Sequence, residues 1–285
     1  MNNKKELYKD LKPFLNCIDY TVSKESYEVM LNEEYDMLVT SPVPSNLETY
    51  YLSEEYISHT DSKKGFIDKI YQLVKNYTLK KKLKLINSFN TKSKTILDVG
   101  AGTGNFLKVC KENNWEIKGV EPSDKARKIA EEKSIKLHKE ITEIKNTSFD
   151  VITLWHVLEH IPNLVEYTNQ LKKLLKPNGV LIIAVPNYKS YDADYYKEFW
   201  AAYDVPRHLW HFSKNSIQKI FSNINMNVEK ILPMKFDSFY VSLLSEKYKN
   251  KKSKAIKAFF VGLKSNLKAK KNGEYSSLMY IIKNK

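Results

Sequence analysis

Residues 95–104 read TILDVGAGTG and carry the clearest structural signal in this chain of 285 residues. Three of its eight glycines, Gly100, Gly102 and Gly104, fall within five positions here. Glycine lets the backbone turn sharply and lets a ligand approach closely without steric cost. The apolar residues before the glycines are typical of a buried parallel strand, and residues 105–114 are typical of a helix. The order of strand, glycine turn and helix predicts an α/β unit with a ligand at its turn.

An acidic residue, Glu121, ends the next strand-like run, residues 116–120. A carboxylate at that position can accept hydrogen bonds from both ribose hydroxyls of a bound nucleoside. The glycine spacing differs from the G-x-G-x-x-G pattern of dinucleotide sites, and Asp98 stands directly before the loop. Because a carboxylate attracts an ammonium group and repels phosphate, these residues predict a nucleoside that carries an amino acid.

The alternation of strands and helices continues towards the C-terminus. We therefore predict an α/β fold with a doubly wound, seven-stranded sheet and helices on both of its faces. The predicted strands are 95–99, 116–120, 135–138, 149–154, 179–185, 228–232 and 276–282. The predicted helices are 104–114, 123–133, 163–176 and 213–225.

Four motifs resemble those of the class I S-adenosylmethionine-dependent methyltransferases, in particular the ubiquinone-biosynthesis type of O-methyltransferase. They are ILDVGAGTG (96–104), GVEPS (119–123), SFDVITLWHVLEHI (148–161) and LKPNGVLIIAVPN (175–187). The resemblance implies a Rossmann-like sheet with an antiparallel last strand. It also implies S-adenosylmethionine as the cofactor, with its methionine part on the glycine loop and its ribose on Glu121. The implied cofactor-binding residues are Asp98, Gly100, Ala101, Gly102, Gly104, Glu121, Pro122 and Trp155.

His156, Glu159 and His160 follow the fourth predicted strand at helical spacing. If residues 155–161 form one helical turn, the three side chains share a face where open α/β sheets bind substrates. In one interpretation, His160 or His156 accepts a proton from a substrate hydroxyl as a general base, with Glu159 beside them. In a second, all three ligate a divalent metal that lowers the pKa of that hydroxyl. In a third, Glu159 and His160 only brace the loop at Pro162.

The metal interpretation is tied to the resemblance. Ubiquinone-biosynthesis O-methyltransferases and small-RNA 2'-O-methyltransferases carry the pattern E-x-x-E-H here, and some of them use magnesium. This chain has His156 where the first glutamate would stand. Because imidazole is a softer ligand than carboxylate, we predict no magnesium site and keep a zinc-like site of His156, Glu159 and His160 as the alternative.

An aromatic-rich loop and the segment DVPRHLWHF, residues 204–212, follow the fifth strand. Aromatic faces hold planar acceptors and stabilise a sulfonium by cation–π attraction, so this region can form a wall of the substrate site. Arg207 could grip a carboxylate or phosphate of the substrate, with His208 and His211 beside it. The alternative is a small satellite core in which Arg207 binds backbone carbonyls.

The charge and the apolar pattern exclude several classes of function. The net charge is +14, but the 47 basic residues include only two arginines, Arg127 and Arg207. Base-edge reading uses the bidentate arginine fork, so we expect no sequence-specific nucleic-acid partner. The longest apolar run, residues 180–185, is too short to cross a bilayer, and the first residues lack a secretory signal. With only Cys17 and Cys110, the chain suits a reducing compartment, and we predict a cytoplasmic protein.

We predict two regions along the chain. Residues 1–60 form a cap region with a hairpin of residues 27–31 and 36–40. This region resembles a zinc ribbon that has lost its cysteine pairs, so we expect no zinc there. Residues 61–285 form the methyltransferase domain.

Two helical segments of this domain carry further predictions. A helix over residues 65–89 is expected to cover the cofactor as a lid, with Tyr56 and His59 before it able to touch ligand. An insertion at about 235–273 precedes the last strand. Within it, residues 251–271 form a basic amphipathic helix that could lie on an anionic membrane, or dock its apolar stripe on the sheet or on a second subunit.

The sequence therefore predicts an enzyme that transfers a methyl group from S-adenosylmethionine to a small-molecule acceptor, with oxygen as the accepting atom. The alternative is a catalytically silent module that binds the cofactor and docks on a membrane or a partner through the lysine-rich helix. Neither the acceptor nor the oligomeric state follows from the sequence.

Overall fold

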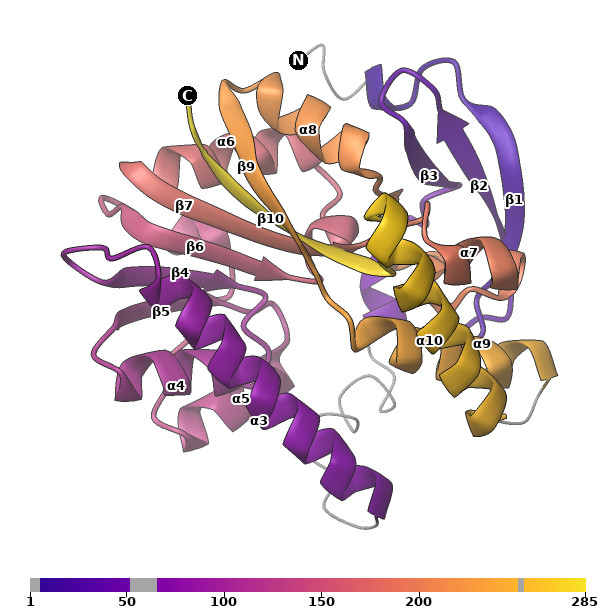
Figure 1. Cartoon of the computed structure of the whole chain (residues 1–285). Helices are drawn as coiled ribbons and strands as arrows, with labels where there is room; N and C mark the ends of the chain where they lie inside the picture. Colours follow the sequence, from indigo (N-terminus) through magenta and orange to yellow (C-terminus); the bar gives the residue numbers. More distant parts are fainter. Residues whose placement is uncertain (1–5, 52–65, 251–253) are drawn as a thin grey trace.

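The computed structural model describes residues 6–51, 66–250 and 254–285, and its centre is a six-stranded sheet (Figure 1). The strands are β4 (Thr95–Val99), β5 (Glu116–Val120), β6 (Phe149–Trp155), β7 (Leu175–Pro186), β9 (Met226–Pro233) and β10 (Ser277–Asn284). They lie in the order β5-β4-β6-β7-β10-β9. The first four are parallel, and β10 runs antiparallel to both of its neighbours. The Rossmann-like sheet and its antiparallel last strand are therefore confirmed.

The prediction of seven strands is wrong, because residues 135–138 do not form a strand. His138 makes only a single parallel bridge to Val120 at the edge of the sheet. Pairing stops there because the chain enters a 3₁₀ turn, η2 (Ile141–Glu143), which is closed by a capping box. A strand needs several consecutive pairs, and this segment makes one.

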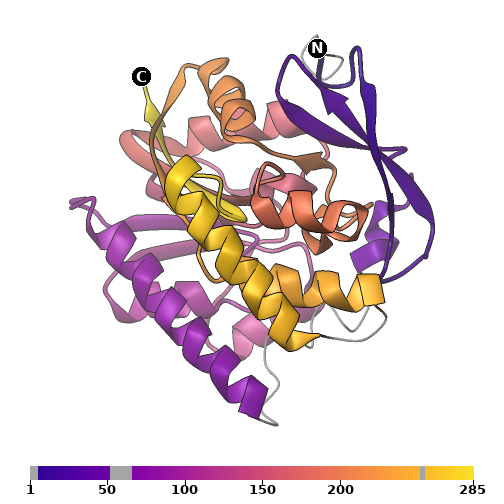
Figure 2. The ribbon, with the colours of Figure 1, turned by 45° about the vertical axis from the view of Figure 1, so that its right-hand side comes forward.

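Helices lie on both faces of the sheet (Figure 2). The apolar side chains of the strands alternate between these two faces. Leu97 and Ile152 join a core with helices α6 and α8, whereas their neighbours Ile96 and Val151 join a core with α3 and α4. Because the strands are buried on both faces, their sequences are continuously apolar. The helices expected on both faces are confirmed. They are α3 (Phe66–Asn87), α4 (Asn105–Glu112), α5 (Asp124–Glu132), α6 (Leu164–Leu174) and α8 (Lys214–Ser222).

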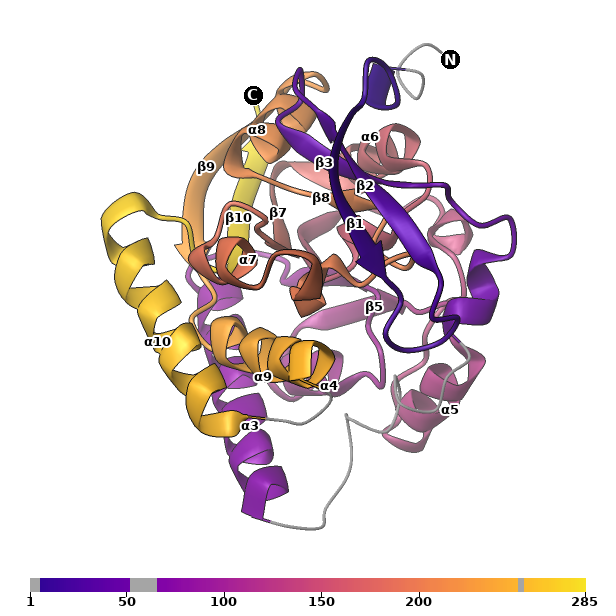
Figure 3. The same cartoon turned by 90° about the vertical axis from the view of Figure 1, so that its right-hand side faces the viewer.

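A second, antiparallel sheet has four strands in the order β1-β2-β3-β8 (Figure 3). They are β1 (Lys12–Ile18), β2 (Ser26–Asn32), β3 (Met37–Ser41) and β8 (Trp210–His211). The predicted hairpin of residues 27–31 and 36–40 is confirmed as β2 and β3. Because β8 comes from the segment 204–212, the N-terminal strands share a sheet with the domain that follows. The predicted boundary at residue 60, together with Tyr56 and His59, lies outside the described residues.

The insertion between β9 and β10 forms two helices, α9 (Asp237–Asn250) and α10 (Ala255–Asn272). They pack closely at Gly262, where an added Cβ atom would lie 2.9 Å from Cδ1 of Phe239. Across the described ranges, every helix is too short or too polar to span a bilayer. The remaining short elements are η1 (Leu47–Tyr51), η3 (Leu158–His160), α7 (Tyr191–Tyr196), η4 (Lys197–Phe199) and η5 (Ala201–Tyr203).

Candidate functional site

The glycine turn between β4 and α4 leaves open space at one position. Gly100, Gly102 and Gly104 have positive φ angles of 68°, 53° and 73°, which glycine adopts without steric cost. Ala101 donates its N–H to the last carbonyl of β5 at 2.9 Å. A Cβ atom at Gly100 would lie 2.4 Å from Cγ2 of Val157, whereas one at Gly102 would meet no atom of the described residues within 4 Å. A ligand can therefore approach the backbone at Gly102.

Glu121 reaches back to this turn from the end of β5. Its Oε2 accepts a hydrogen bond from the N–H of Gly102 at 2.8 Å, and its Oε1 accepts one from the N–H of Ser123 at 3.0 Å. Burial raises the pKa of this carboxyl group, and the two hydrogen bonds partly oppose the shift. A carboxylate has about four lone-pair sites, so both oxygens keep acceptor capacity for a ligand. Pro122, the next residue, is exposed beside it.

Asp98 is buried near the carboxyl end of β4. Its Oδ1 accepts a hydrogen bond of 2.6 Å from Oγ1 of Thr153 on β6. Burial raises the pKa of Asp98 to about 7, and the Thr153 hydrogen bond and the charge of Lys82 only partly oppose this. A cation bound beside Asp98 would favour its ionised form. Two carboxyl groups thus flank the glycine turn, as the sequence predicted.

Lys82 on α3 is a member of the site that the sequence did not single out. Its Nζ lies 3.9 Å from the centroid of the Trp155 ring, which packs edge-on against Phe106. Burial lowers the pKa of Lys82 to about 8, although the charges of Asp98 and Asp237 act in the opposite direction. The Nε1 atom of Trp155 is buried and has no hydrogen-bond partner among the described residues. In the sequence, Lys82 is one of three consecutive lysines, and only the packing of α3 distinguishes it.

His156 does not share one helical turn with Glu159 and His160, so that expectation is wrong. Its φ angle of 56° breaks the helix, and only residues 158–160 form a 3₁₀ turn. The His156 ring lies between two acids, with Nε2 3.0 Å from Oδ2 of Asp237 and Nδ1 3.5 Å from Oε1 of Glu159. Burial would lower the pKa of His156, but the two acids outweigh it and raise that pKa to about 10. At neutral pH, therefore, His156 is a cation and holds its proton.

Glu159, His160 and His208 form the cluster that the structure brings together, and their ligand atoms lie within 4.8 Å of one another. The Glu159 carboxylate is fully buried, and neither oxygen has a hydrogen-bond partner in the described part of the chain. Burial would raise the pKa of Glu159, but the 3.5 Å ion-pair contact with His156 and the electrostatic attraction of His208 outweigh it and lower that pKa. His208 replaces His156 in the metal set predicted from the sequence, because the turn at His156 directs that ring towards Asp237.

The two histidines of the cluster are anchored in the same way. Nδ1 of His160 lies 3.1 Å from the carbonyl oxygen of Arg207, and Nδ1 of His208 lies 2.8 Å from that of Ala202. A carbonyl oxygen only accepts, so each Nδ1 carries a hydrogen, and Nε2 has the lone pair in a neutral ring. Burial and the electrostatic effect of the neighbouring His208 lower the pKa of His160 to about 4. His160 is therefore neutral at physiological pH.

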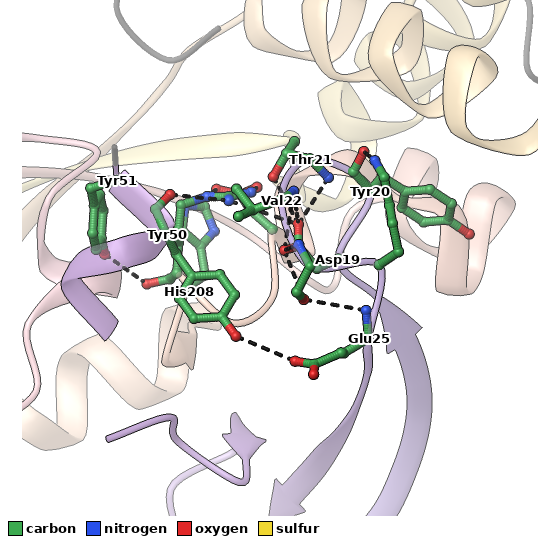
Figure 4. Close-up of polar contacts among 12 residues, drawn as sticks. Asp19, Tyr20, Thr21, Val22, Glu25, Tyr50, Tyr51 and His208 are labelled. Carbon is green, nitrogen blue, oxygen red and sulfur yellow. Dashed lines mark hydrogen bonds and ion pairs between the residues drawn. The ribbon is translucent and has the colours of Figure 1, made fainter. Parts of the chain in front are cut away.

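Arg207 and His211 lie behind this cluster, against the N-terminal sheet. Arg207 is only 3% exposed and pairs with Asp204 and, at 3.8 Å, with Asp19. Figure 4 shows Asp19 at the β1–β2 turn, where it accepts hydrogen bonds from backbone N–H groups of residues 21–23. Nε2 of His211 lies 3.0 Å from Oγ1 of Thr40 on β3. Both side chains thus have internal partners, and of the predicted substrate-binding residues only His208 adjoins Glu159 and His160.

A family model described as a methyltransferase domain matches residues 71–231, more than half of the chain. The ubiquinone biosynthesis O-methyltransferase of Actinobacillus pleuropneumoniae serotype 7 is 34% identical over 108 residues, which are 33% of this chain and 46% of that enzyme. The enzyme of the same name from Rickettsia bellii is 27% identical over 195 residues, which cover 62% of this chain and 80% of that enzyme. The chain thus matches about half the length of the first relative.

Two solved structures share the fold at low sequence identity. Magnesium protoporphyrin IX methyltransferase from Synechocystis PCC 6803, solved with bound SAH, has a TM-score of 0.56 and 12% identity, and the match covers 85% of this chain and all of that one. A plantazolicin methyltransferase, also solved with SAH, has a TM-score of 0.54 and 14% identity, and the match covers 84% of this chain and 94% of that one.

Proposed function

The chain belongs to the methyltransferase domain family, and on that basis we propose that it transfers a methyl group from S-adenosylmethionine to an oxygen of a small-molecule acceptor. The family predicted from the sequence is confirmed by this membership. The oxygen acceptor is supported by the O-methyltransferase names of the Actinobacillus and Rickettsia relatives. The relationship of residues 1–60 to a zinc ribbon and the cytoplasmic location stay predictions.

The observation that carries the proposal is the pair of carboxyl groups, Asp98 and Glu121, on either side of the open backbone at Gly102. Asp98 is buried and lacks a direct cationic hydrogen-bond partner among the described residues, so an α-ammonium group is the complement that its charged form needs. Glu121 retains acceptor sites for two ribose hydroxyls. The Trp155 ring at the end of β6 already carries the Lys82 ammonium at 3.9 Å from its centroid, so the two carboxyl groups and not this ring carry the proposal.

In the proposed reaction, the main role of this chain is to position the cofactor and the acceptor. S-adenosylmethionine would supply an activated methyl group on its sulfonium. Asp98 and Glu121 would hold the two ends of the cofactor, and the 158–160 turn would hold the acceptor side at the end of the neighbouring strand β6. Alignment of the reacting atoms and exclusion of water supply much of the acceleration in such a displacement.

On the acceptor side, we assign proton acceptance to His160 rather than His156. His156 already carries a proton at neutral pH, whereas His160 is neutral and anchored through Nδ1. The negative charge of Glu159 would stabilise the imidazolium that forms when His160 takes the acceptor proton. Glu159 thus acts on the proton through His160.

A metal-assisted version of the same site is the second candidate. The observation that favours it is the buried Glu159 carboxylate without a hydrogen-bond partner in the described ranges, facing two histidines whose Nδ1 atoms are already bound. Carbonyl-bound Nδ1 atoms are the usual arrangement behind metal-ligating Nε2 atoms. Glu159, His160 and His208 would then hold a zinc-like ion that lowers the pKa of the acceptor hydroxyl.

Cofactor binding is tested by titrating the protein with S-adenosylmethionine in a calorimeter. We expect Asp98→Ala or Glu121→Ala to weaken binding at least about tenfold, because charged hydrogen bonds contribute about 1.5 to 3 kcal/mol each. Glu112→Ala is the matched control, since this exposed acid on α4 lies outside the site. Unchanged affinity in both site variants would overturn the cofactor assignment.

Turnover is tested with methyl-labelled S-adenosylmethionine and a cell extract that contains candidate acceptors. His160→Asn keeps a donor towards the Arg207 carbonyl and removes Nε2, so we expect kcat to fall about a hundredfold with unchanged cofactor affinity. His138→Asn, on the exposed edge of the sheet, is the control.

A chelator distinguishes the two versions of the site. If a chelator abolishes wild-type activity and zinc restores it, the metal version holds; if a chelator has no effect, the base version holds. Tight binding without any labelled product would favour the silent module.

A further inference from the structure

An apolar surface runs across three helices next to the candidate site. On α10, five apolar side chains recur at helical spacing and are 36% to 78% exposed. On α3, Leu73 and Tyr77 are 70% and 46% exposed. The stripe on α10 consists of Ile256, Phe259, Phe260, Leu263 and Leu267.

Ring contacts make this surface continuous. Tyr77 packs edge-on against Phe236 at 5.7 Å between ring centroids, and Phe239, three residues further, stacks on Phe259 at 5.4 Å. Phe236 is itself 43% exposed. The sequence pointed to residues 251–271 alone, and the structure adds α3 and the start of α9 to the same surface.

The charged residues of α10 have one sign. α10 contains five lysines and no acidic residue. Lys264, Lys268, Lys270 and Lys271 are exposed, whereas Lys257 pairs with the buried Glu246 at 3.2 Å. A two-fold contact between two copies of α10 would bring lysines against lysines without an acid on the helix to offset them. An anionic partner would therefore complement the positive charge of this face.

We propose that this surface docks on an anionic lipid bilayer. A helix with aromatic and aliphatic side chains on one side and lysines beside them inserts the former at the headgroup boundary and pairs the latter with acidic lipids. Because Phe236 precedes Asp237, which binds His156, the docked bilayer would lie beside the acceptor end of the site. This docking proposal does not depend on the proposal of methyl transfer.

The test is sedimentation of the full chain with vesicles of phosphatidylcholine alone and of phosphatidylcholine mixed with phosphatidylglycerol. We expect binding to the mixed vesicles, at least about tenfold stronger than to the neutral ones, that weakens as salt is added. Equal binding to both vesicles, or binding to neither, overturns the proposal.

Two pairs of variants separate the apolar and the charged contributions. Phe259→Ser/Phe260→Ser should reduce binding to the mixed vesicles at least about tenfold, whereas Phe14→Ser, 44% exposed on β1, should leave it unchanged. Lys270→Glu/Lys271→Glu should weaken binding more than the charge-matched Lys125→Glu/Lys128→Glu on α5. If the Phe variant binds like the wild type, or if it only converts a dimer to a monomer in light scattering, the bilayer is not the occupant.

Discussion

The carboxyl group of Asp98 titrates near neutral pH because its place between β4 and β6 removes it from water. In an unfolded chain, the same group would ionise with its ordinary pKa of 3.8. Burial therefore disfavours the charged form that an ammonium group requires. The proposed cofactor would supply the missing positive charge, so binding and ionisation of Asp98 are coupled.

This coupling predicts a pH dependence of cofactor binding. Below about pH 7 Asp98 is protonated in the free protein, and binding must release that proton. We expect the affinity for S-adenosylmethionine to fall by up to about tenfold per pH unit below that point and to flatten above it. Calorimetry in buffers of different ionisation enthalpy measures the released proton directly. In Asp98→Asn the slope should vanish, and a wild-type affinity that is independent of pH between 5 and 8 would contradict the coupling.

His156 and His160 show how strongly the surroundings of a histidine in the fold change its pKa. Burial alone would lower the pKa of His156, but Asp237 and Glu159 raise it to about 10. The pKa of His160 is lowered to about 4 by burial and by His208. Asp237 lies 81 positions away along the chain in the insertion helix, so the sequence around His156 gave no indication of this partner.

Among the elements, the β4–α4 turn contains two glycines, Gly100 and Gly102, that differ in the space around them. At Gly100 a Cβ atom would collide with Val157, and at Gly102 it would enter open space. Both positions have a positive φ, so both substitutions carry backbone strain of about 1 kcal/mol. Only the first adds a steric clash.

Two alanine variants test this difference. Gly100→Ala should lower the free energy of unfolding by about 3 kcal/mol, because overpacking adds to the strain, and Val157→Ala should partly restore it. Gly102→Ala should cost only about 1 kcal/mol yet weaken S-adenosylmethionine binding at least about tenfold. Urea unfolding and calorimetry measure the two effects. Equal losses of stability in both variants would show that the two positions do not differ as described.

For the whole molecule, the N-terminal sheet is held to the methyltransferase part by buried polar contacts as well as by β8. Arg207 sits between Asp204 in its own segment and Asp19 in the β1–β2 turn. Thr40 on β3 donates to the carbonyl of His208 at 2.6 Å. These contacts join strands of residues 12–41 to a segment about 170 positions later.

We therefore expect the two sheets to unfold together. Arg207→Met removes the cationic partner of the buried Asp19 and the half-buried Asp204 and should destabilise the protein by about 3 kcal/mol. Lys12→Met removes an exposed pair with Glu33 and should cost less than about 1 kcal/mol. Circular dichroism and tryptophan fluorescence during urea unfolding should report one shared transition in the wild type. Two separate transitions would mean that the N-terminal sheet is an independent unit.

Much of the central domain could be predicted from local sequence because local physics controls it. The strands are continuously apolar since both faces of the sheet are covered, and the three glycines of the β4–α4 turn stand where φ is positive. Asp98 and Glu121 meet at the turn because the carboxyl ends of adjacent parallel strands lie side by side. Spacing along the chain therefore sufficed for the fold class and for placing Asp98 and Glu121 at the same glycine turn.

The other residues of the candidate site are brought together by contacts between distant segments. Lys82 comes from α3, Asp237 from α9 and His208 from the segment before β8, and no periodic pattern links them to residues 156–160. Two other differences have local causes that hydrophobic periodicity does not report: a capping box follows the single bridge at His138, and His156 has a positive φ. Periodicity encodes which face of an element is buried, whereas the identity of a side chain's partner is fixed only when the elements pack.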